Sequence, residues 1–158
     1  MKSARRRKKR QRLKPARSVE ANVRRFAPRL FRRYFRRGRR VATLYAGVPE
    51  LHRFRIRTKR LRYISELYQR LFPRALTRAV VELKGIQDVL GALQDHATVA
   101  AYFERRLVSV RNAARQAEYV RVLHRARVRQ EACRRQFLQR WRRLERTRFR
   151  DRILNAIE

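Results

Sequence analysis

Five side chains between residues 51 and 72 have the types and the spacing to hold an anion. His52, Arg55, Lys59, Arg62 and Glu66 follow one another at intervals of 3, 4, 3 and 4 residues. An α-helix turns once in about 3.6 residues, so these intervals place all five side chains on one helical face. The face carries four nitrogen bases and one acid. It is therefore predicted either to be solvated or to bind a negatively charged ligand.

A charged helix face is usually only solvated, with acids and bases interleaved on it. The charges next to these residues are therefore informative. Lys59 has Arg55 one turn before it and Arg62 one turn after it, and Glu66 is the only acid in line. Two like charges about 6 Å apart repel by roughly 0.7 kcal/mol in water and by about 3 kcal/mol at an effective dielectric constant of about 20. A solvated row tolerates this repulsion, whereas a partly enclosed row needs an anion.

The same residues offer little for catalysis. His52 is the one member whose charge changes near neutral pH, but no nucleophile or carboxylate pair accompanies it. His96 and His124 stand apart from any metal-ligand set. The sequence also lacks a Gly-rich phosphate loop, a Glu-x-Glu-x-Lys pattern and an acidic cluster for Mg²⁺. We therefore expect a protein that holds phosphate without cleaving it, with no catalytic residue, cofactor or metal site.

The composition extends this basic character to the whole chain. Its 158 residues include 46 Lys and Arg against 12 Asp and Glu, which gives a formal net charge of +34. All but six of the cations are arginine, the residue whose forked guanidinium binds phosphate in a bidentate manner. Hydrophobic residues still make up 44% of the chain, enough for one folded domain. A bound polyanion would relieve the self-repulsion of such a domain.

Helices are the elements that must position these side chains. Residues 1–17 are expected to form a disordered basic arm, and residues 18–158 a single helical domain. Ser18 is predicted to cap the first helix, Pro28 to kink or split it, and Gly38 to end it. The apolar stripe of this helix is predicted to be Val19, Val23, Phe26, Leu30 and Tyr34.

The rest of the chain follows the same helical period. The central helix is expected between Gly47 and Pro73, and the next helical region is predicted to bend near Asp95, where a further helix would begin. A last helical region covers residues 113–147. Sustained strand alternation is missing, so the predicted fold class is all-α, an antiparallel helical bundle.

Two runs of sequence resemble the CHAD domain, a helical family named for its histidines and associated with inorganic polyphosphate. They are LHRFRIRTKRLRYISELYQRLF at residues 51–72 and LKGIQDVLGALQDHATVAAYF at residues 83–103. The first carries the pattern His-x-x-Arg-x-x-x-Lys-Arg-x-Arg-Tyr-x-x-Glu, matched by His52, Arg55, Lys59, Arg60, Arg62, Tyr63 and Glu66. The second carries Leu-Gly-x-x-x-Asp, matched by Leu90, Gly91 and Asp95.

The resemblance implies a fold in which two similar four-helix bundles enclose a basic channel that takes up polyphosphate. The similarity is strong over residues 51–103 and loose to about residue 144, and residues before 51 resemble only the segment that connects the two halves. The N-terminal repeat with its own histidine helix has no counterpart here, so one half plus a preceding helix is expected. A homodimer would then supply the second wall of the channel.

On this resemblance the protein is expected to bind polyphosphate without enzymatic activity. The expected polyphosphate-binding residues are His52, Arg53, Arg55, Lys59, Arg60, Arg62 and Tyr63, supported by Glu66, Lys84 and Asp95. Two alternatives stay open: a nucleic-acid-binding protein that contacts the phosphate backbone without reading bases, and an interaction protein that uses the charge to associate with partners.

The cellular setting is predicted from what the sequence lacks. Cys133 is the single cysteine, so an intrachain disulfide is excluded and a reducing compartment is compatible with the sequence. A signal peptide and a membrane-spanning run are not recognisable. We expect a cytoplasmic protein that does not bind membranes, and the resemblance adds association with polyphosphate granules.

Overall fold

The computed structural model describes residues 15–158, which form five helices and no strand. The helices are α1 (Val19–Val41), α2 (Val48–Leu67), α3 (Pro73–Leu107), α4 (Ala113–Arg146) and α5 (Phe149–Ile157). The predicted all-α bundle is thereby confirmed. The expected basic arm falls almost entirely on residues 1–14, outside the described part. Within that part, a helix long and apolar enough to span a lipid bilayer is not found.

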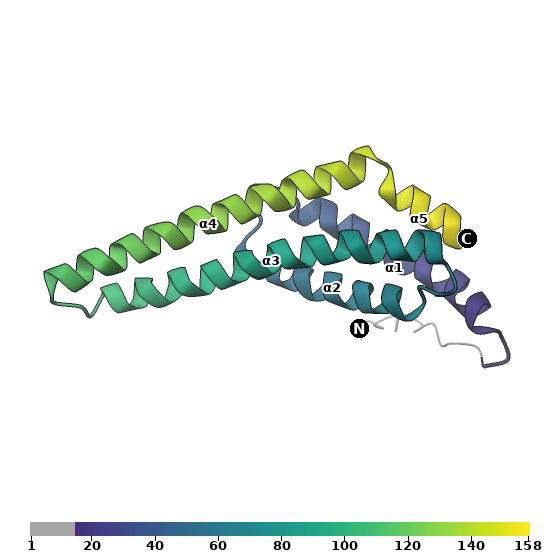
Figure 1. Ribbon diagram of the computed structural model, residues 1–158, viewed down its shortest axis with the longest axis horizontal. Coiled ribbons are helices and arrows are strands. Elements are labelled where there is room, and N and C mark those ends of the chain that lie inside the picture. The colour runs from purple at the N-terminus through teal and green to yellow at the C-terminus, as the bar shows by residue number, and fades with distance from the viewer. Residues whose placement is uncertain (1–14) are drawn as a thin grey trace, which may run out of the picture.

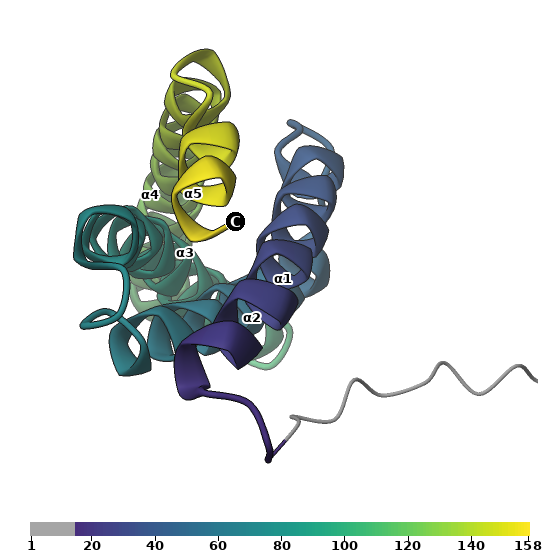
Figure 2. The ribbon, with the colours of Figure 1, turned by 90° about the vertical axis from the view of Figure 1, so that its right-hand side faces the viewer.

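The two longest helices, α3 and α4, form an antiparallel hairpin that runs the length of the molecule (Figure 1). One half of this hairpin carries the other helices: α2 packs along α3, α1 packs along α2, and α5 lies between α4 and α1 (Figure 2). The other half, which includes the turn between α3 and α4, extends past them (Figure 1). The bundle half therefore holds the main core.

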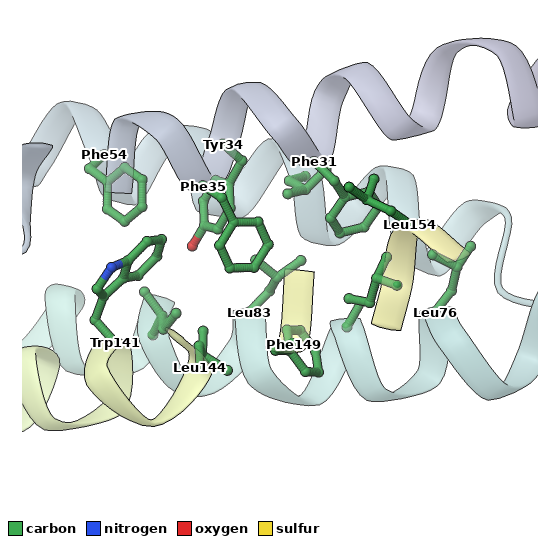
Figure 3. Close-up of a cluster of buried hydrophobic side chains, with 14 of the residues drawn as sticks. Phe31, Tyr34, Phe35, Phe54, Leu76, Leu83, Trp141, Leu144, Phe149 and Leu154 are labelled. Carbon is green, nitrogen blue, oxygen red and sulfur yellow. The ribbon is translucent and has the colours of Figure 1, made fainter. Parts of the chain in front are cut away.

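Aromatic side chains from α1, α2, α4 and α5 fill that core (Figure 3). Tyr34 of α1 stacks on Phe54 of α2, with ring centroids 4.9 Å apart. Phe54 meets Trp141 of α4 edge to face at 5.7 Å. Large rings bury much apolar surface and favour offset or edge-on contacts of this kind. The cluster fixes α1, α2 and α4 relative to one another.

Two polar residues lie on the buried face of α2. Thr58 and Ser65 are fully buried, and each hydroxyl donates to the carbonyl four residues earlier in the helix, at 3.0 Å and 2.9 Å. Tyr34 Oη lies 3.2 Å from Thr58 Oγ1, so the buried phenol is also satisfied. Burial raises the pKa of Tyr34, since the phenolate would lose its water.

The first helix begins as predicted but does not end where Gly38 was expected to stop it. Ser18 caps α1 by accepting from Ala21 N at 3.2 Å. Pro28 is buried inside α1 without splitting it, and Gly38 lies inside the helix. A Cβ at Gly38 would come within 1.9 Å of Trp141 Cη2, so this glycine allows α1 to approach α4. The packing of α1 outweighs both local breaking signals.

The predicted bend near Asp95 is wrong, because α3 runs without a break from Pro73 to Leu107. Asp95 and His96 lie in its interior, and α4 packs along it. The central helix ends at Leu67, before the predicted limit at residue 72. The short α5 was not anticipated; Arg148, in the left-handed region with φ 46°, separates it from α4.

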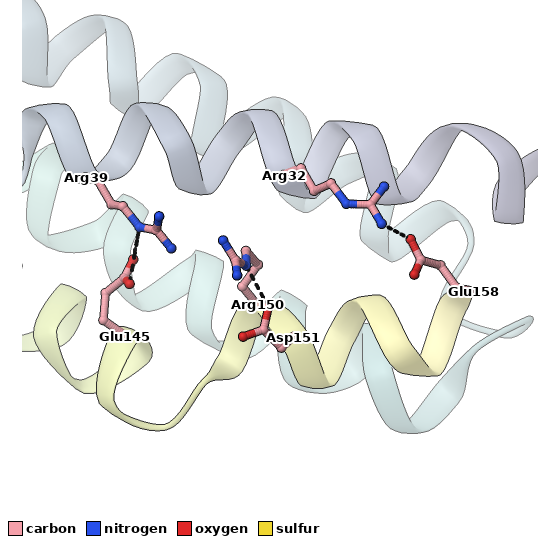
Figure 4. Close-up of polar contacts among 6 residues, drawn as sticks. All are labelled: Arg32, Arg39, Glu145, Arg150, Asp151 and Glu158. Atoms are coloured by element: carbon pink, nitrogen blue, oxygen red, sulfur yellow. Dashed lines mark hydrogen bonds and ion pairs between the residues drawn. The ribbon is translucent and has the colours of Figure 1, made fainter.

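Charged contacts join α1 to the C-terminal part of the chain (Figure 4). Arg39 Nε lies 3.1 Å from Glu145 Oε1 of α4, and Arg32 pairs with Glu158, the residue that follows α5. Arg24 donates to the carbonyl of Ile157 at 3.0 Å. Arg24, Arg32 and Arg39 therefore each have an acceptor in or next to α4 and α5.

Candidate functional site

Helix α2 has one buried face and a basic flank on each side of it. Its buried residues recur at intervals of 3, 4, 3 and 4: Leu51, Phe54, Thr58, Leu61 and Ser65. The four predicted cations His52, Arg55, Lys59 and Arg62, which we call the basic stripe, follow each buried position by one residue and lie on the flank next to α3. The core packing therefore dictates where the stripe points.

Arg62 is the most firmly held member of the stripe. Its Nε donates to Gln87 Oε1 of α3 at 3.0 Å, and its Nη1 pairs with Glu66 one turn further along α2. The guanidinium carbon lies 4.5 Å from the ring centroid of Tyr63, and Lys59 Nζ lies 5.6 Å from the same ring. Tyr63 is half exposed and faces these two cations, which it attracts through its ring face.

Arg55 occupies space that a glycine provides. A Cβ at Gly91 of α3 would lie 3.4 Å from Arg55 Nε and 3.6 Å from Arg55 Nη2. Gly91 is buried and interior to α3, where glycine costs about 0.5–1 kcal/mol relative to alanine. The glycine thus gives the guanidinium room between the two helices.

Three buried polar atoms along this flank have no hydrogen-bond partner within residues 15–158: His52 Nδ1, Arg55 Nε and Gln94 Oε1. The pairing of Arg62 with Gln87 and of Arg55 with Gly91 shows that α2 and α3 are antiparallel here. Gln94, one turn beyond Gly91, therefore lies toward the His52 end of α2. A buried polar group without a partner costs about 1–3 kcal/mol. His52 Nδ1, when protonated, and Arg55 Nε can donate, so an anion that supplies acceptor oxygens to them would be favoured, whereas Gln94 Oε1 needs a donor.

Arg134 of α4 positions the start of α2. Its Nη1 donates to the carbonyls of Leu44 at 3.4 Å and Ala46 at 2.5 Å, in the loop that precedes the helix. Glu131 pairs with the same guanidinium at 3.4 Å. Because the loop is tied to α4 in this way, the N-terminal end of the stripe has a defined place.

The predicted site residues divide between the two flanks of α2. Glu66 lies with the stripe, and Tyr63 lies beside it. Lys84 and Asp95 are exposed on the face of α3 that carries Gly91, at spacings of 7 and 4 residues from it. Arg53 and Arg60 lie on the opposite flank, next to α1. The structure thus separates these two arginines from the stripe.

On that opposite flank, α1 and α2 form a groove that sequence reasoning missed. Arg33 and Arg37 of α1 and Arg57 and Arg60 of α2 line it, together with Leu30, Tyr34, Leu61 and Ile64, and its volume is about 250 Å³. We call it the arginine groove. Desolvation and the charges of Arg37, Arg33, Arg53 and Arg60 lower the pKa of Arg57. The pair Arg33 and Arg37, four residues apart in a predicted helix, was the available signal.

Metal-ligating side chains do not gather in the described part of the chain. Within residues 15–158 there is no group of three or more His, Cys, Asp or Glu side chains that could hold a metal ion. His96 lies inside α3 and His124 is exposed on α4. Burial raises the pKa of the Cys133 thiol, which disfavours the reactive thiolate.

A comparison with protein families finds one match. The family model described as the CHAD domain matches residues 2–104, which include α1, α2 and nearly all of α3. The match begins before residue 51, where the strong resemblance of the sequence starts, and ends before α4. It contains the stripe, Gly91 and the arginine groove. No curated protein and no solved structure matches the chain.

Proposed function

Because the chain belongs to the CHAD domain family, we propose that it binds inorganic polyphosphate through the basic stripe, without catalysing a reaction. His52, Arg55, Lys59 and Arg62 would contact the phosphates. Tyr63, Glu66, Lys84 and Asp95 would orient these cations or border the site, and Arg53 and Arg60 would attract the anion from the opposite flank. Binding is expected in the cytoplasm, including on polyphosphate granules.

The observation that carries this proposal is the set of unpartnered polar atoms along the stripe. His52 Nδ1 and Arg55 Nε are buried and lack a hydrogen-bond partner within residues 15–158, while Gln87 and Glu66 hold Arg62 in place. A chain of phosphates offers acceptor oxygens at regular intervals along its length, as the stripe offers cations at every turn of α2. Arginine and lysine both bind phosphate oxygens, arginine in a bidentate manner.

Binding without turnover fits the chemistry of the residues near the stripe. Hydrolysis or transfer of phosphate commonly needs a positioned base and clustered carboxylates that hold Mg²⁺. In the part that the structure describes, the acid in line with the stripe is Glu66, which is paired with Arg62. We therefore assign His52 to binding: the protonated imidazole would donate to a phosphate oxygen.

We also propose that a second copy of the chain supplies an opposing wall, since the stripe occupies one side of an open face of α2. The two-fold symmetry of a homodimer would bring two identical stripes to one polyanion. Light scattering on the free protein and on its polyphosphate complex tests this. A dimer is expected in the complex, and a monomer in both samples would count decisively against the second copy.

Nucleic-acid binding is the alternative function, and exposed arginines on the first half of α4 favour it. Arg121, Arg125 and Arg129 follow one another at intervals of four residues on that helix. Contacts of this kind to a sugar-phosphate backbone would not distinguish sequences. This alternative predicts similar affinity for duplex DNA and for polyphosphate at matched charge.

One titration series separates the two functions. Long-chain polyphosphate and duplex DNA are titrated at several salt concentrations against three proteins: the wild type, a form lacking residues 1–17, and the triple variant Arg55→Ala, Lys59→Ala, Arg62→Ala. Polyphosphate is expected to bind the wild type more tightly than DNA, with affinity that falls steeply as salt rises. The stripe function is refuted if removing residues 1–17 abolishes polyphosphate binding while the triple variant binds normally.

A further inference from the structure

Two pairs of arginines on α1 lie in different surroundings. Arg32 and Arg39 face the C-terminal part of the chain and pair with Glu158 and Glu145 (Figure 4). Arg33 and Arg37 face α2 and make no ion pair with a described residue. The side of α1 that carries Arg33 and Arg37 and faces α2 is therefore uncompensated by carboxylates of the described residues.

Helix α2 adds two more guanidinium groups to the uncompensated side. Arg57 and Arg60 line the groove opposite Arg33 and Arg37, and neither forms an ion pair within residues 15–158. The hydrogen bond between Tyr34 and Thr58, together with the ring contact of Phe26 with Tyr68 at 5.7 Å, sets the antiparallel register of α1 and α2. This register places Arg37 near the level of Arg57 and Arg33 near that of Arg60.

The floor of the groove makes the charge cluster stronger. Leu30, Leu61 and Ile64 line it, and Tyr34 lies among them with its hydroxyl group already bonded to Thr58. Such a floor keeps water away from one side of the guanidinium groups, which strengthens every charge interaction there. Desolvation and four neighbouring arginines lower the pKa of Arg57, so this cation is destabilised in the absence of an anion.

The dimensions of the cluster indicate an anion longer than a single phosphate. Arg33 and Arg37 are one turn apart, about 6 Å along the axis of α1, and Arg57 and Arg60 are about 4.5 Å apart along α2. A single phosphate has too few oxygens to bind all four guanidinium groups in a bidentate manner. Three linked phosphates span a comparable length, carry several negative charges and fit a groove of about 250 Å³.

We propose that the arginine groove is a second anion-binding site, which takes a linear triphosphate group between Arg33 and Arg37 of α1 and Arg57 and Arg60 of α2. This site is separate from the stripe, on the other flank of α2, and does not depend on the stripe binding polyphosphate. Its ligand is either free inorganic oligophosphate or the triphosphate of a nucleotide. The phosphate chemistry is the same in both.

Calorimetric titration with inorganic tripolyphosphate at physiological salt tests the site directly. Three variants are compared with the wild type: Arg33→Gln, Arg37→Gln, Arg57→Gln in the groove; Arg55→Ala, Lys59→Ala, Arg62→Ala in the stripe; and Arg121→Gln, Arg125→Gln, Arg129→Gln on α4 as the charge-matched control. The groove variant is expected to lose one binding site, and the other two to keep it. Wild-type stoichiometry and affinity in the groove variant would overturn the proposal. Wild-type stoichiometry and affinity in the stripe variant would instead count against phosphate binding by the stripe.

The same titration with orthophosphate and with a nucleoside triphosphate identifies the ligand class. Orthophosphate is expected to bind the groove at least about tenfold more weakly, because it contacts fewer guanidinium groups. Orthophosphate affinity equal to that of tripolyphosphate would overturn the triphosphate assignment. Tighter binding of the nucleoside triphosphate would support a nucleotide as the source, and equal or weaker binding would support free oligophosphate.

Arginine modification of the wild type gives a second measurement that does not rely on variants. Phenylglyoxal is applied with and without tripolyphosphate, and the modified residues are mapped by mass spectrometry. Arg33, Arg37 and Arg57 are expected to be protected by the ligand, while Arg121, Arg125 and Arg129 react as before. Equal protection of both sets would mean non-specific attraction and would contradict a defined site.

Discussion

The two flanks of α2 carry similar charge in different surroundings. On the α3 side, the stripe has fixed neighbours: Gln87 and Glu66 hold Arg62, Tyr63 lies beside Lys59, and Gly91 gives Arg55 its space. On the α1 side, the four arginines of the groove contact apolar side chains and have no carboxylate partner among the described residues.

The cations of the stripe are therefore held by neighbouring side chains, whereas those of the arginine groove are not. These neighbours restrict the positions of Arg55, Lys59 and Arg62, so ligand binding costs little free energy to organise these three cations. The groove lacks such partners, and mutual repulsion raises the free energy of its cations until an anion arrives. We therefore expect the orientation of the cations to govern binding on the first flank, and the number of guanidinium groups that an anion contacts to govern binding on the second.

The largest expected effect is a loss of stability of the fold that holds both flanks of α2. A Cβ at Gly38 would overlap Trp141, whose ring cannot move without disturbing the aromatic core. Gly38→Ala is expected to lower the free energy of unfolding by about 3 kcal/mol, the upper end for overpacking. Gly85→Ala is the control, since its Cβ would meet only the flexible end of Arg140. Chemical denaturation of both variants measures this, and equal stability would contradict the close packing of α1 on α4.

Opposite changes in stability are expected when one cation is neutralised on each flank. Arg62→Met loses the bonds to Gln87 and Glu66 and is expected to lower stability by about 1 kcal/mol. Arg57→Met is expected to raise it by about 0.5 kcal/mol at low salt. The folded state lowers the pKa of Arg57, and near pH 7 this cation is protonated in both states, so its charge opposes folding. Thermal denaturation of both variants measures these changes. A loss of stability in both would contradict the predicted difference between the two flanks.

A change of shape without a change of charge tests the geometry of the stripe. Gly91→Leu fills the space of the Arg55 guanidinium and is expected to weaken polyphosphate binding about fivefold, from the loss of one oriented phosphate contact. The net charge stays the same, so an electrostatic account without geometry predicts no change. Binding is measured at fixed salt with Gly85→Ala as the control, and circular dichroism confirms that α3 remains helical.

The smallest expected effect releases Arg62 from its acid. Glu66→Gln leaves the guanidinium held by Gln87 alone and is expected to raise polyphosphate affinity about twofold. Glu118→Gln, an exposed change on α4, removes the same charge at a distance and serves as the control. An equal gain in both variants would show that only the net charge matters at this position.

The helical period of the sequence predicted the fold class and the shared face of the stripe residues, because both depend on local spacing. The intervals from His52 to Glu66 placed these residues on one face, and the buried residues of α2 confirm that face as a flank of the core. Val23 and Tyr34 were correctly assigned to the buried face of α1. Val19, from the same predicted stripe, is 60% exposed because it lies in the first turn, where the core ends.

The remaining errors come from contacts between distant segments. Gly38 was interpreted as a helix end because glycine breaks helices, yet its role depends on Trp141, more than a hundred residues away. The residues around Asp95 stay helical because α4 packs along α3. The arginine groove was missed for the same reason. Arg33 and Arg37 lie opposite Arg57 only because α1 packs on α2.

The most direct test of the stripe compares two triple variants that remove the same charge. Arg55→Ala, Lys59→Ala, Arg62→Ala changes the stripe, and Arg121→Ala, Arg125→Ala, Arg129→Ala changes exposed arginines of α4. The affinity for long-chain polyphosphate is measured at one physiological salt concentration. We predict a loss of at least about tenfold for the stripe variant and of less than about threefold for the α4 variant, since oriented contacts add to the shared electrostatic attraction. Equal losses would contradict the assignment of polyphosphate binding to the stripe.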